Sequence, residues 1–184
     1  MSRYEDNHFD LAIVDPPYGI DADKKNSAKK LQSKKSAGLS KDYGNQKWDS
    51  DIPNDEYFAE LKRVSKRQVV WGANFFNLQG GMLFWHKHVT MPTYSQGELA
   101  WLSWLNKVDF VSIAWHGMIQ HDMKNKEIRI HPTQKPVKLY EWLLMNYAKE
   151  GDKILDTHLG SGSIALACHN LGYDLTACEL DKEY

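Results

Sequence analysis

The feature that most constrains the fold is a glycine-containing turn between a strand and a helix near the end of the chain. Residues 153–156 are typical of a buried strand, and Gly160-Ser161-Gly162 precedes an apolar helix over 164–171. A further strand is predicted over 175–180. Strand, helix and strand within about thirty residues form a βαβ unit, whose two strands lie parallel. The sequence therefore predicts an α/β fold with a mostly parallel sheet.

The same turn has the features of a cofactor site. Gly160, Gly162 and Ala165 match the pattern G-x-G-x-x-G/A, in which small residues let a ligand approach the backbone. Glu179 follows 17 residues after Gly162, near the end of the next strand. A carboxylate there can accept hydrogen bonds from both hydroxyls of a ribose. A tight turn without a ligand is the alternative, but the combination favours a nucleoside-bearing cofactor.

A second motif, Asp15-Pro16-Pro17-Tyr18, follows a predicted buried strand over residues 9–14. Pro17 has no N–H, and consecutive prolines stiffen the backbone, so the Pro16 carbonyl is fixed and free to accept a hydrogen bond. Asp15 supplies a second acceptor, and Tyr18 supplies an aromatic face. Two acceptors beside a ring suit a planar group with an exocyclic amine, such as a flipped-out base. An ordinary turn at the end of a strand is the alternative.

The remaining elements are expected from hydrophobic spacing, caps and breakers. Asn54 is expected to cap a helix that continues to Val64. The other expected elements are strands over 68–71, 82–85 and 110–115, a Trp-rich helix over 98–105, a loop over 116–135 and a helix from Pro136 to a stop at Gly151. We predict one domain over 1–184. Because a crossover helix is expected where the chain stops, we expect a truncated or natural fragment.

A lysine-rich segment lies between residues 24 and 47, which contain eight lysines and one acidic residue, Asp42. Its other residues are mainly Ser, Ala, Gly, Asn and Gln, which predicts a mobile, solvated loop over about 21–50. Lysines on a flexible arm also bind nucleic-acid phosphates, and the two interpretations are compatible. The lysines assigned to nucleic acid are Lys24, Lys25, Lys29, Lys30, Lys34 and Lys35.

Composition excludes several classes of protein. No apolar run approaches the roughly 20 residues of a membrane-spanning helix, and the first residues lack the apolar segment of a secretory signal. Two cysteines, Cys168 and Cys178, are too few for a disulfide framework, and we expect Cys168 in the core. The eight histidines show no ligand spacing, so no metal is expected. Trp71 and Trp85 are either core residues or part of a pocket mouth.

These motifs, in this order, resemble the amino-methyltransferases of DNA. Asp15–Tyr18 precedes both the segment His131-Pro132-Thr133-Gln134-Lys135-Pro136 and the glycine turn, which is the permuted order of the β class. Protein glutamine methyltransferases and many RNA methyltransferases carry a similar motif after the glycines, so the order argues against them. Residues 71–76 and 98–101 also resemble phage-type members. The resemblance implies a Rossmann-like S-adenosylmethionine-dependent methyltransferase fold with helices on both faces of the sheet, and a target-recognition insertion over about 86–130.

The resemblance also assigns roles to individual residues. Asp15, Pro16, Pro17 and Tyr18 match the catalytic motif, in which the Asp15 carboxylate and the Pro16 carbonyl hold the target amino group and Tyr18 stacks on the base. The residues expected to bind S-adenosylmethionine are Thr133, Lys135, Asp156, His158, Gly160, Ser161, Gly162 and Glu179. Thr157 and His158 replace the Pro and Phe common in the family, a variation that phage-like members share.

The implied reaction is site-specific transfer of a methyl group to N6 of adenine in DNA, as in restriction-modification. Asp15 is similar to the first motif residue of adenine-N6 enzymes, whereas cytosine-N4 enzymes usually have Ser there. A cytosine-N4 enzyme and an inactive DNA-binding relic are the alternatives. The expected partner is DNA, with no membrane and no metal. We expect a monomer or homodimer in the cytoplasm of a bacterial or phage-infected cell, and no segment indicates the recognition sequence.

Overall fold

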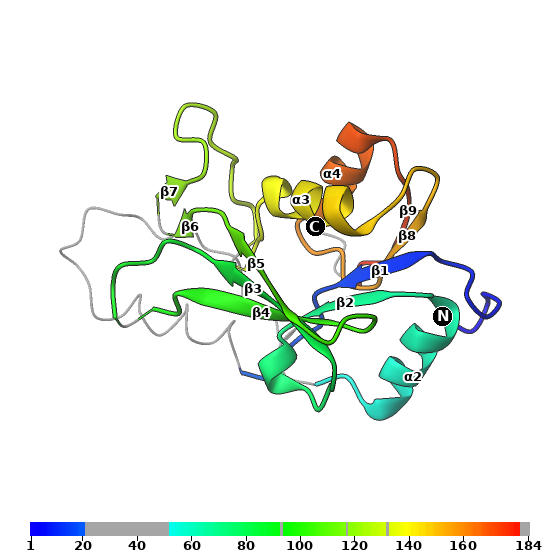
Figure 1. Ribbon diagram of the computed structural model, residues 1–184. Helices are drawn as coiled ribbons and strands as arrows, with labels where there is room; N and C mark the ends of the chain where they lie inside the picture. Colours follow the sequence, from blue (N-terminus) through cyan, green and yellow to red (C-terminus); the bar gives the residue numbers. More distant parts are fainter. Residues whose placement is uncertain (21–51, 93, 117, 132, 181–184) are drawn as a thin grey trace.

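The computed structural model describes residues 1–20, 52–92, 94–116, 118–131 and 133–180. Seven strands form one sheet in the order β5-β3-β4-β2-β1-β8-β9 (Figure 1). The strands are β1 (Leu11–Val14), β2 (Gln68–Trp71), β3 (Gly81–His86), β4 (Gly97–Leu102), β5 (Val108–Ser112), β8 (Lys153–Asp156) and β9 (Asp174–Ala177). Neighbouring strands are parallel except at β4, which is antiparallel to both β2 and β3. The predicted α/β fold with a mostly parallel sheet is confirmed.

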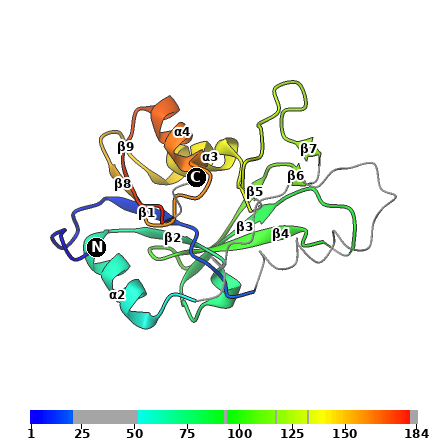
Figure 2. The same ribbon diagram turned by 180° about the vertical axis from the view of Figure 1, so that it is seen from behind.

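Helices pack on both faces of this sheet, as Figures 1 and 2 show from opposite sides. The helices are α2 (Asp55–Val64), α3 (Val137–Tyr147), α4 (Ser163–Leu171) and the short 3-10 turn η2 (Ala73–Phe75). Leu11 and Ile13 of β1 face the core shared with α3 and α4, whereas Ala12 and Val14 face the core shared with α2. Because both faces of β1 are covered, all four of its residues are buried, as expected for a central parallel strand.

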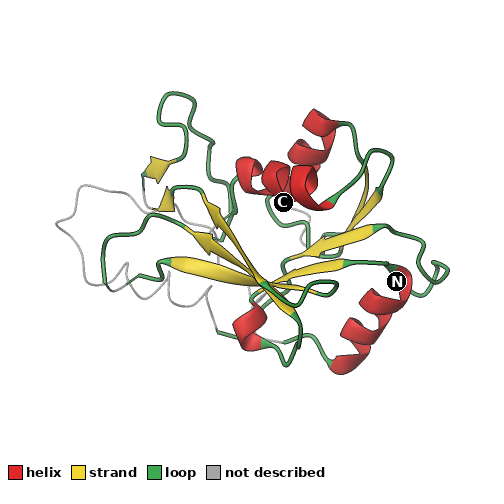
Figure 3. Ribbon diagram, in the orientation of Figure 1, coloured by secondary structure: helices red, strands yellow, loops and turns green. Residues whose placement is uncertain are grey.

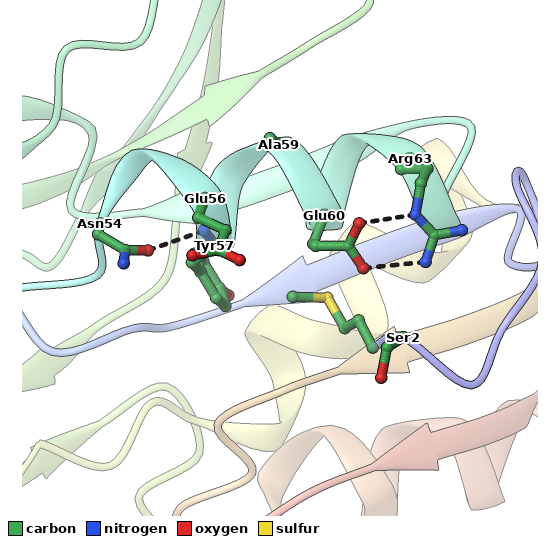
Figure 4. Close-up of a pocket in the computed structure, with 8 residues that line it drawn as sticks. Ser2, Asn54, Glu56, Tyr57, Ala59, Glu60 and Arg63 are labelled. Carbon is green, nitrogen blue, oxygen red and sulfur yellow. Dashed lines mark hydrogen bonds and ion pairs between the residues drawn. The ribbon is translucent and has the colours of Figure 1, made fainter.

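Helix α2 begins and ends as the sequence predicts. The Asn54 side chain accepts a hydrogen bond from the Tyr57 N–H at 2.9 Å, which caps the first turn (Figure 4). Glu60 and Arg63 pair one turn apart, and Arg63 also reaches Asp6 at 2.8 Å. These contacts attach the first residues of the chain to the helix.

The predicted helix over 98–105 is wrong, because residues 97–102 form strand β4 (Figure 3). Ala100 and Leu102 enter one core, while Leu99 and Trp101 pack in the other. An apolar run buried on both faces has no period that separates strand from helix, and pairing with β2 and β3 decides the structure.

Smaller differences concern strand ends and tryptophans. The expected strands over 110–115 and 175–180 are β5 and β9, which begin and end earlier, and the expected loop over 116–135 includes part of a small hairpin, β6 (Trp115–His116) and β7 (Ile119–Gln120). Trp71 and Trp85 are fully buried, so the alternative that they line a pocket mouth is wrong. Cys168 lies in the core as predicted.

The lysine-rich segment lies outside the described residues, so its predicted phosphate contacts stay predictions. Among the residues that are described, no helix is both long enough and apolar enough to cross a membrane. The same residues contain no cluster of three or more His, Cys, Asp or Glu side chains suited to a metal ion.

Candidate active site at the carboxyl ends of the strands

The predicted site residues gather at one edge of the sheet. Strands β2, β1, β8 and β9 run parallel, so their carboxyl ends meet at the same edge. Asp15 follows β1, Gly72 follows β2, Asp156 ends β8 and Glu179 follows β9. Ligands of open α/β sheets bind beyond this edge, where loops from several strands converge. The topology therefore places the two sequence motifs, far apart in the chain, beside each other.

Asp15 lies at the centre of a hydrogen-bonded cluster. Its Oδ1 accepts a hydrogen bond from the Tyr18 hydroxyl at 2.5 Å. Its Oδ2 forms an ion pair with Lys135 Nζ, and that ammonium lies 3.4 Å from the Tyr18 hydroxyl oxygen. Pro16 is buried and Pro17 half-buried, so packing fixes the backbone of the motif next to Asp15. The structure thus brings Lys135, predicted as a cofactor contact, to the predicted catalytic carboxylate.

Two charged residues that the sequence motifs do not include complete this cluster. Glu98 on β4 lies 3.2 Å from Lys135 Nζ through its Oε2, and its other oxygen pairs with Lys87, which follows β3. Burial opposes the charge of Lys135, but the negative charges of Asp15 and Glu98 outweigh it and raise the pKa of Lys135 above its ordinary value. Burial likewise opposes ionisation of Glu98, but the two ammonium groups lower its pKa to about 2. Lys135 and Glu98 are therefore both charged near neutral pH.

The ring of Tyr18 is held by its neighbours. Phe75 stacks on it with 4.9 Å between ring centroids and 14° between planes, and Phe76 approaches edge-on. Gly72, which has φ of +75°, lies so close that a Cβ there would come within 2.2 Å of Tyr18 Cε1. Burial and the charge of Asp15 raise the pKa of the Tyr18 hydroxyl well above its ordinary value, so the hydroxyl stays a donor.

The glycine turn and Glu179 are joined by a hydrogen bond, whereas the predicted contact of Glu179 with a ribose stays a prediction. Gly160 N–H donates to Glu179 Oε2 at 2.7 Å, and Leu180 N–H donates to Oε1 at 2.8 Å. Gly160 and Gly162 have φ of +52° and +72°, values that glycine adopts without a steric penalty. A Cβ added at Gly162 would meet nothing within 4 Å, so space is open beside the turn. Ser161 extends its hydroxyl to that of Ser163 at 3.0 Å.

Asp156 and His158 lie at the end of β8, directly before the glycine turn. His158 N–H donates to Asp156 Oδ1 at 2.9 Å. Burial, opposed by this hydrogen bond and reinforced by the charges of Asp15 and Glu179, raises the pKa of Asp156 to about 7. The Thr157 hydroxyl bonds to the Tyr57 hydroxyl at 2.7 Å, which links the segment after β8 to α2. Tyr57 belongs to none of the sequence motifs, so only its contact with Thr157 in the folded chain identifies it as a neighbour of the site.

Thr133 occupies a more exposed position than Lys135. Its N and Oγ1 atoms lie 3.3 and 3.1 Å from His131 Nδ1. Its predicted cofactor contact stays a prediction.

Two hollows on the described surface lie apart from this cluster. One, of about 630 Å³, is lined by the first two residues and by α2, with Glu60 and Arg63 on its wall (Figure 4). The other, of about 430 Å³, is lined by residues such as Trp104 and Trp142. Neither is lined by Asp15 or the glycine turn. The candidate site is therefore identified by the types and arrangement of its side chains and not by the size of a cavity.

Comparison with protein families gives a match over most of the chain. A family model described as DNA methylase (N6/N4) matches residues 39–184. The matched range begins after Asp15–Tyr18, so this match does not depend on the catalytic motif.

Two curated relatives match shorter stretches. The Type II methyltransferase M.HpaI of Haemophilus parainfluenzae is 40% identical over 60 residues, 33% of this chain and 19% of that protein. The Type II methyltransferase M2.DpnII of Streptococcus pneumoniae is 43% identical over 54 residues, 29% of this chain and 20% of that protein. The matching stretch of the chain spans about a fifth of the length of these relatives.

Solved structures of methyltransferases share the fold. The M1.HpyAVI–SAM complex is 20% identical with a TM-score of 0.55, over 97% of this chain and 86% of that one. The cytosine-N4-specific PvuII DNA methyltransferase is 15% identical with a TM-score of 0.58, over 100% and 79%. The TTHA0409 protein of Thermus thermophilus, complexed with S-adenosylmethionine, is 15% identical with a TM-score of 0.56, over 100% and 84%. At these identities the likeness establishes the fold alone, and the predicted methyltransferase fold is confirmed.

Proposed function

The chain belongs to the N6/N4 DNA methylase family, and we propose that it transfers a methyl group from S-adenosylmethionine to the exocyclic N6 nitrogen of adenine in DNA. The observation that carries this proposal is the position of Asp15, at the sheet edge that also holds the glycine turn and Glu179. The choice of adenine rests on Asp as the first residue of the motif.

The residues at the edge fit the proposed cofactor. S-adenosylmethionine supplies an electrophilic methyl group together with a nucleoside whose ribose has two hydroxyls. The Glu179 carboxylate accepts hydrogen bonds, and the backbone beside Gly162 leaves open space for a ligand. Two relatives of known structure, M1.HpyAVI and TTHA0409, are described as complexes with this cofactor, which supports the assignment.

The residues of the chain would act by positioning the target amine. The N6 lone pair of adenine is delocalised into the ring, so the amine is a poor nucleophile. Asp15 and the Pro16 carbonyl would each accept a hydrogen bond from one of the two N–H groups of the amine. These hydrogen bonds favour a tetrahedral nitrogen whose lone pair points at the methyl group. Each carboxylate oxygen has two lone pairs, so Asp15 can accept from the amine while Tyr18 and Lys135 donate to it. Most of the acceleration then comes from orientation and charge placement.

Methylation of DNA followed by mass spectrometry of the digested product tests the proposal. We expect N6-methyladenine. N4-methylcytosine alone would contradict the adenine assignment, and the likeness to the fold of the cytosine-N4-specific PvuII enzyme is the reason to measure both bases. Binding of S-adenosylmethionine without any methylated base would instead identify a DNA-binding relic.

Glu179→Ala is expected to weaken the binding of S-adenosylmethionine by about 1.5–3 kcal/mol, the usual contribution of a hydrogen bond to a charged acceptor. Isothermal calorimetry measures this loss. Because Glu179 also accepts from Gly160 N–H, Glu179→Gln is the matched variant: it keeps an acceptor for the turn and removes the charge. Unchanged affinity in both folded variants would remove Glu179 from the cofactor site.

The lysine-rich segment is proposed to contact DNA phosphates. Changing Lys24, Lys25, Lys29 and Lys30 to Gln is expected to weaken binding to all DNA sequences about equally. The slope of log K against log salt should become shallower by roughly 0.9 for each phosphate of duplex DNA that is no longer neutralised. Fluorescence anisotropy at several salt concentrations measures both quantities. An unchanged affinity and slope would make the segment a solvated spacer.

A further inference from the structure

Behind the Asp15 carboxylate, acidic and basic side chains alternate in a row of four. Asp15 pairs with Lys135, Lys135 lies 3.2 Å from Glu98, and Glu98 pairs with Lys87. Three of these residues lie on or directly after strands β1, β3 and β4, and Lys135 lies in the segment before α3, so the row exists only in the folded chain. Asp15 is the only one of the four that belongs to the proposed catalytic motif.

Aromatic rings enclose the row and reduce its contact with water. Lys135 is 4% exposed, and its Nζ lies 5.2 Å from the centre of the Trp71 ring and 5.9 Å from that of Tyr18. Lys87 Nζ lies 4.7 Å from the centre of the Trp85 ring. Charges interact more strongly in such surroundings than in bulk water, so each member affects its neighbours. An uncompensated charge on one member of the row would therefore change the electrostatic potential at the Asp15 carboxylate.

The sign of that effect follows from the proposed reaction. As the new N–C bond forms and the bond from the methyl group to the sulfonium sulfur breaks, positive charge develops on the amino nitrogen that Asp15 holds, and this charge is lost when one of the two amino protons leaves to water. A lone ammonium at Lys135 would oppose this charge and would also draw the Asp15 carboxylate toward itself. Glu98 supplies the compensating negative charge from the side of Lys135 away from the motif.

On this basis, and resting on the proposed function, we infer that Glu98 is a positioning residue of the methyl-transfer site. It shares Lys135 with Asp15, holds the ammonium in place and balances its charge, so that the Asp15 carboxylate remains an effective acceptor for the target amine. Glu98 itself contacts no substrate. Its effect reaches the reaction through Lys135.

The balance of charge also predicts a change with pH. The ionisable groups around Lys135 are Asp15 and Tyr18 after β1, Glu98 on β4, Tyr140 on α3 and Asp156 at the end of β8. Because Glu98 helps to raise the pKa of Lys135, neutralising Glu98 lowers that pKa toward the working range. Loss of the Lys135 proton removes the uncompensated charge, so the variant should regain part of its rate as the pH rises through the lowered value, whereas the wild type should show no such rise.

The test is Glu98→Gln in the full chain, with single-turnover methylation of DNA measured between pH 7 and pH 10. We expect the rate at pH 7.5 to fall about 10- to 100-fold. We also expect the affinity for S-adenosylmethionine to change less than twofold, and a rise in rate on the alkaline side that the wild type lacks. Glu60→Gln is the matched control, because it removes a carboxylate from an ion pair on α2, remote from Asp15. That control should keep the rate and the pH profile of the wild type.

The outcomes separate this inference from the proposed function. A wild type that methylates no DNA contradicts the function itself. A wild type that methylates, together with a Glu98→Gln rate within twofold of it or a loss that is equal at every pH, overturns the role of Glu98. If circular dichroism shows that the Gln variant does not fold, Glu98→Asp replaces it. The shorter carboxylate keeps the charge but retracts from Lys135, so a three- to tenfold loss is expected and a wild-type rate would overturn the inference.

Discussion

Asp15→Ala is expected to reduce methyl transfer by about 1000-fold or more while leaving the affinity for S-adenosylmethionine nearly unchanged, since a positioned polar group contributes roughly 10²–10⁴ to a rate. The carboxylate that follows β1 is the proposed acceptor for the target amine, whereas the proposed cofactor contacts, the glycine turn and Glu179, follow β8 and β9. The fold should survive, because Lys135 keeps Glu98 as its partner when Asp15 is removed. Single-turnover methylation and calorimetry measure the two quantities.

Two variants make this result specific. Asp15→Asn keeps the size of the side chain and one acceptor oxygen but loses the charge, so we expect a rate between those of the wild type and the Ala variant. Asp10→Ala is the matched control: Asp10 precedes the same strand and pairs with Lys66 at 2.6 Å, far from the carboxyl edge. It should lose some stability and keep the rate. An Asp15→Ala rate within tenfold of the wild type would show that the amine is held elsewhere.

The sequence predicted those parts of the fold whose signals are local. The βαβ unit with its glycine turn and the capped helix α2 each combine a breaker or cap with a clear period, and the structure confirms them. The failure at β4 has a physical cause. Ala100, Trp101 and Leu102 of the strand are buried on alternate faces, and Trp101 and the following Trp104, three apart, imitate helical spacing. Strand pairing across the sheet overrides that local preference.

The site shows the same division between local and long-range information. Asp15, Tyr18, Gly160 and Glu179 come from short motifs, and the sheet topology brings their two segments to one edge as the α/β fold requires. The ion pair of Lys135 with Asp15 joins residues 120 positions apart, and no motif carries that information. Glu98 and Lys87 are ordinary charged residues in the sequence. Only the ion pairs that link them to Lys135 in the folded chain make them part of the site.

Gly72→Ala is expected to displace Tyr18 and to reduce methyl transfer by about 100-fold, within the range that a misplaced active-site group costs. Gly72 precedes η2 with φ of +75°, and a Cβ there would lie 2.2, 2.6 and 2.8 Å from three atoms of the Tyr18 ring. The ring cannot shift freely, because Phe75 stacks on it and its hydroxyl donates to Asp15. Relief of the clash therefore moves the aromatic face proposed to stack on the target base.

The cost of the Gly72 substitution has two parts that a second glycine can separate. A non-glycine residue in the left-handed region costs roughly 1–2 kcal/mol, and crowding in a packed site adds about 1–3 kcal/mol. Gly172 has φ of +74°, and a Cβ there would meet nothing within 4 Å, so Gly172→Ala incurs only the first cost. Thermal unfolding should show the larger loss of stability for Gly72→Ala, and methylation assays should show a loss of rate for that variant alone. Equal stability and equal rates in the two variants would mean that the Tyr18 ring moves without consequence, and the stacking role of Tyr18 would then be abandoned.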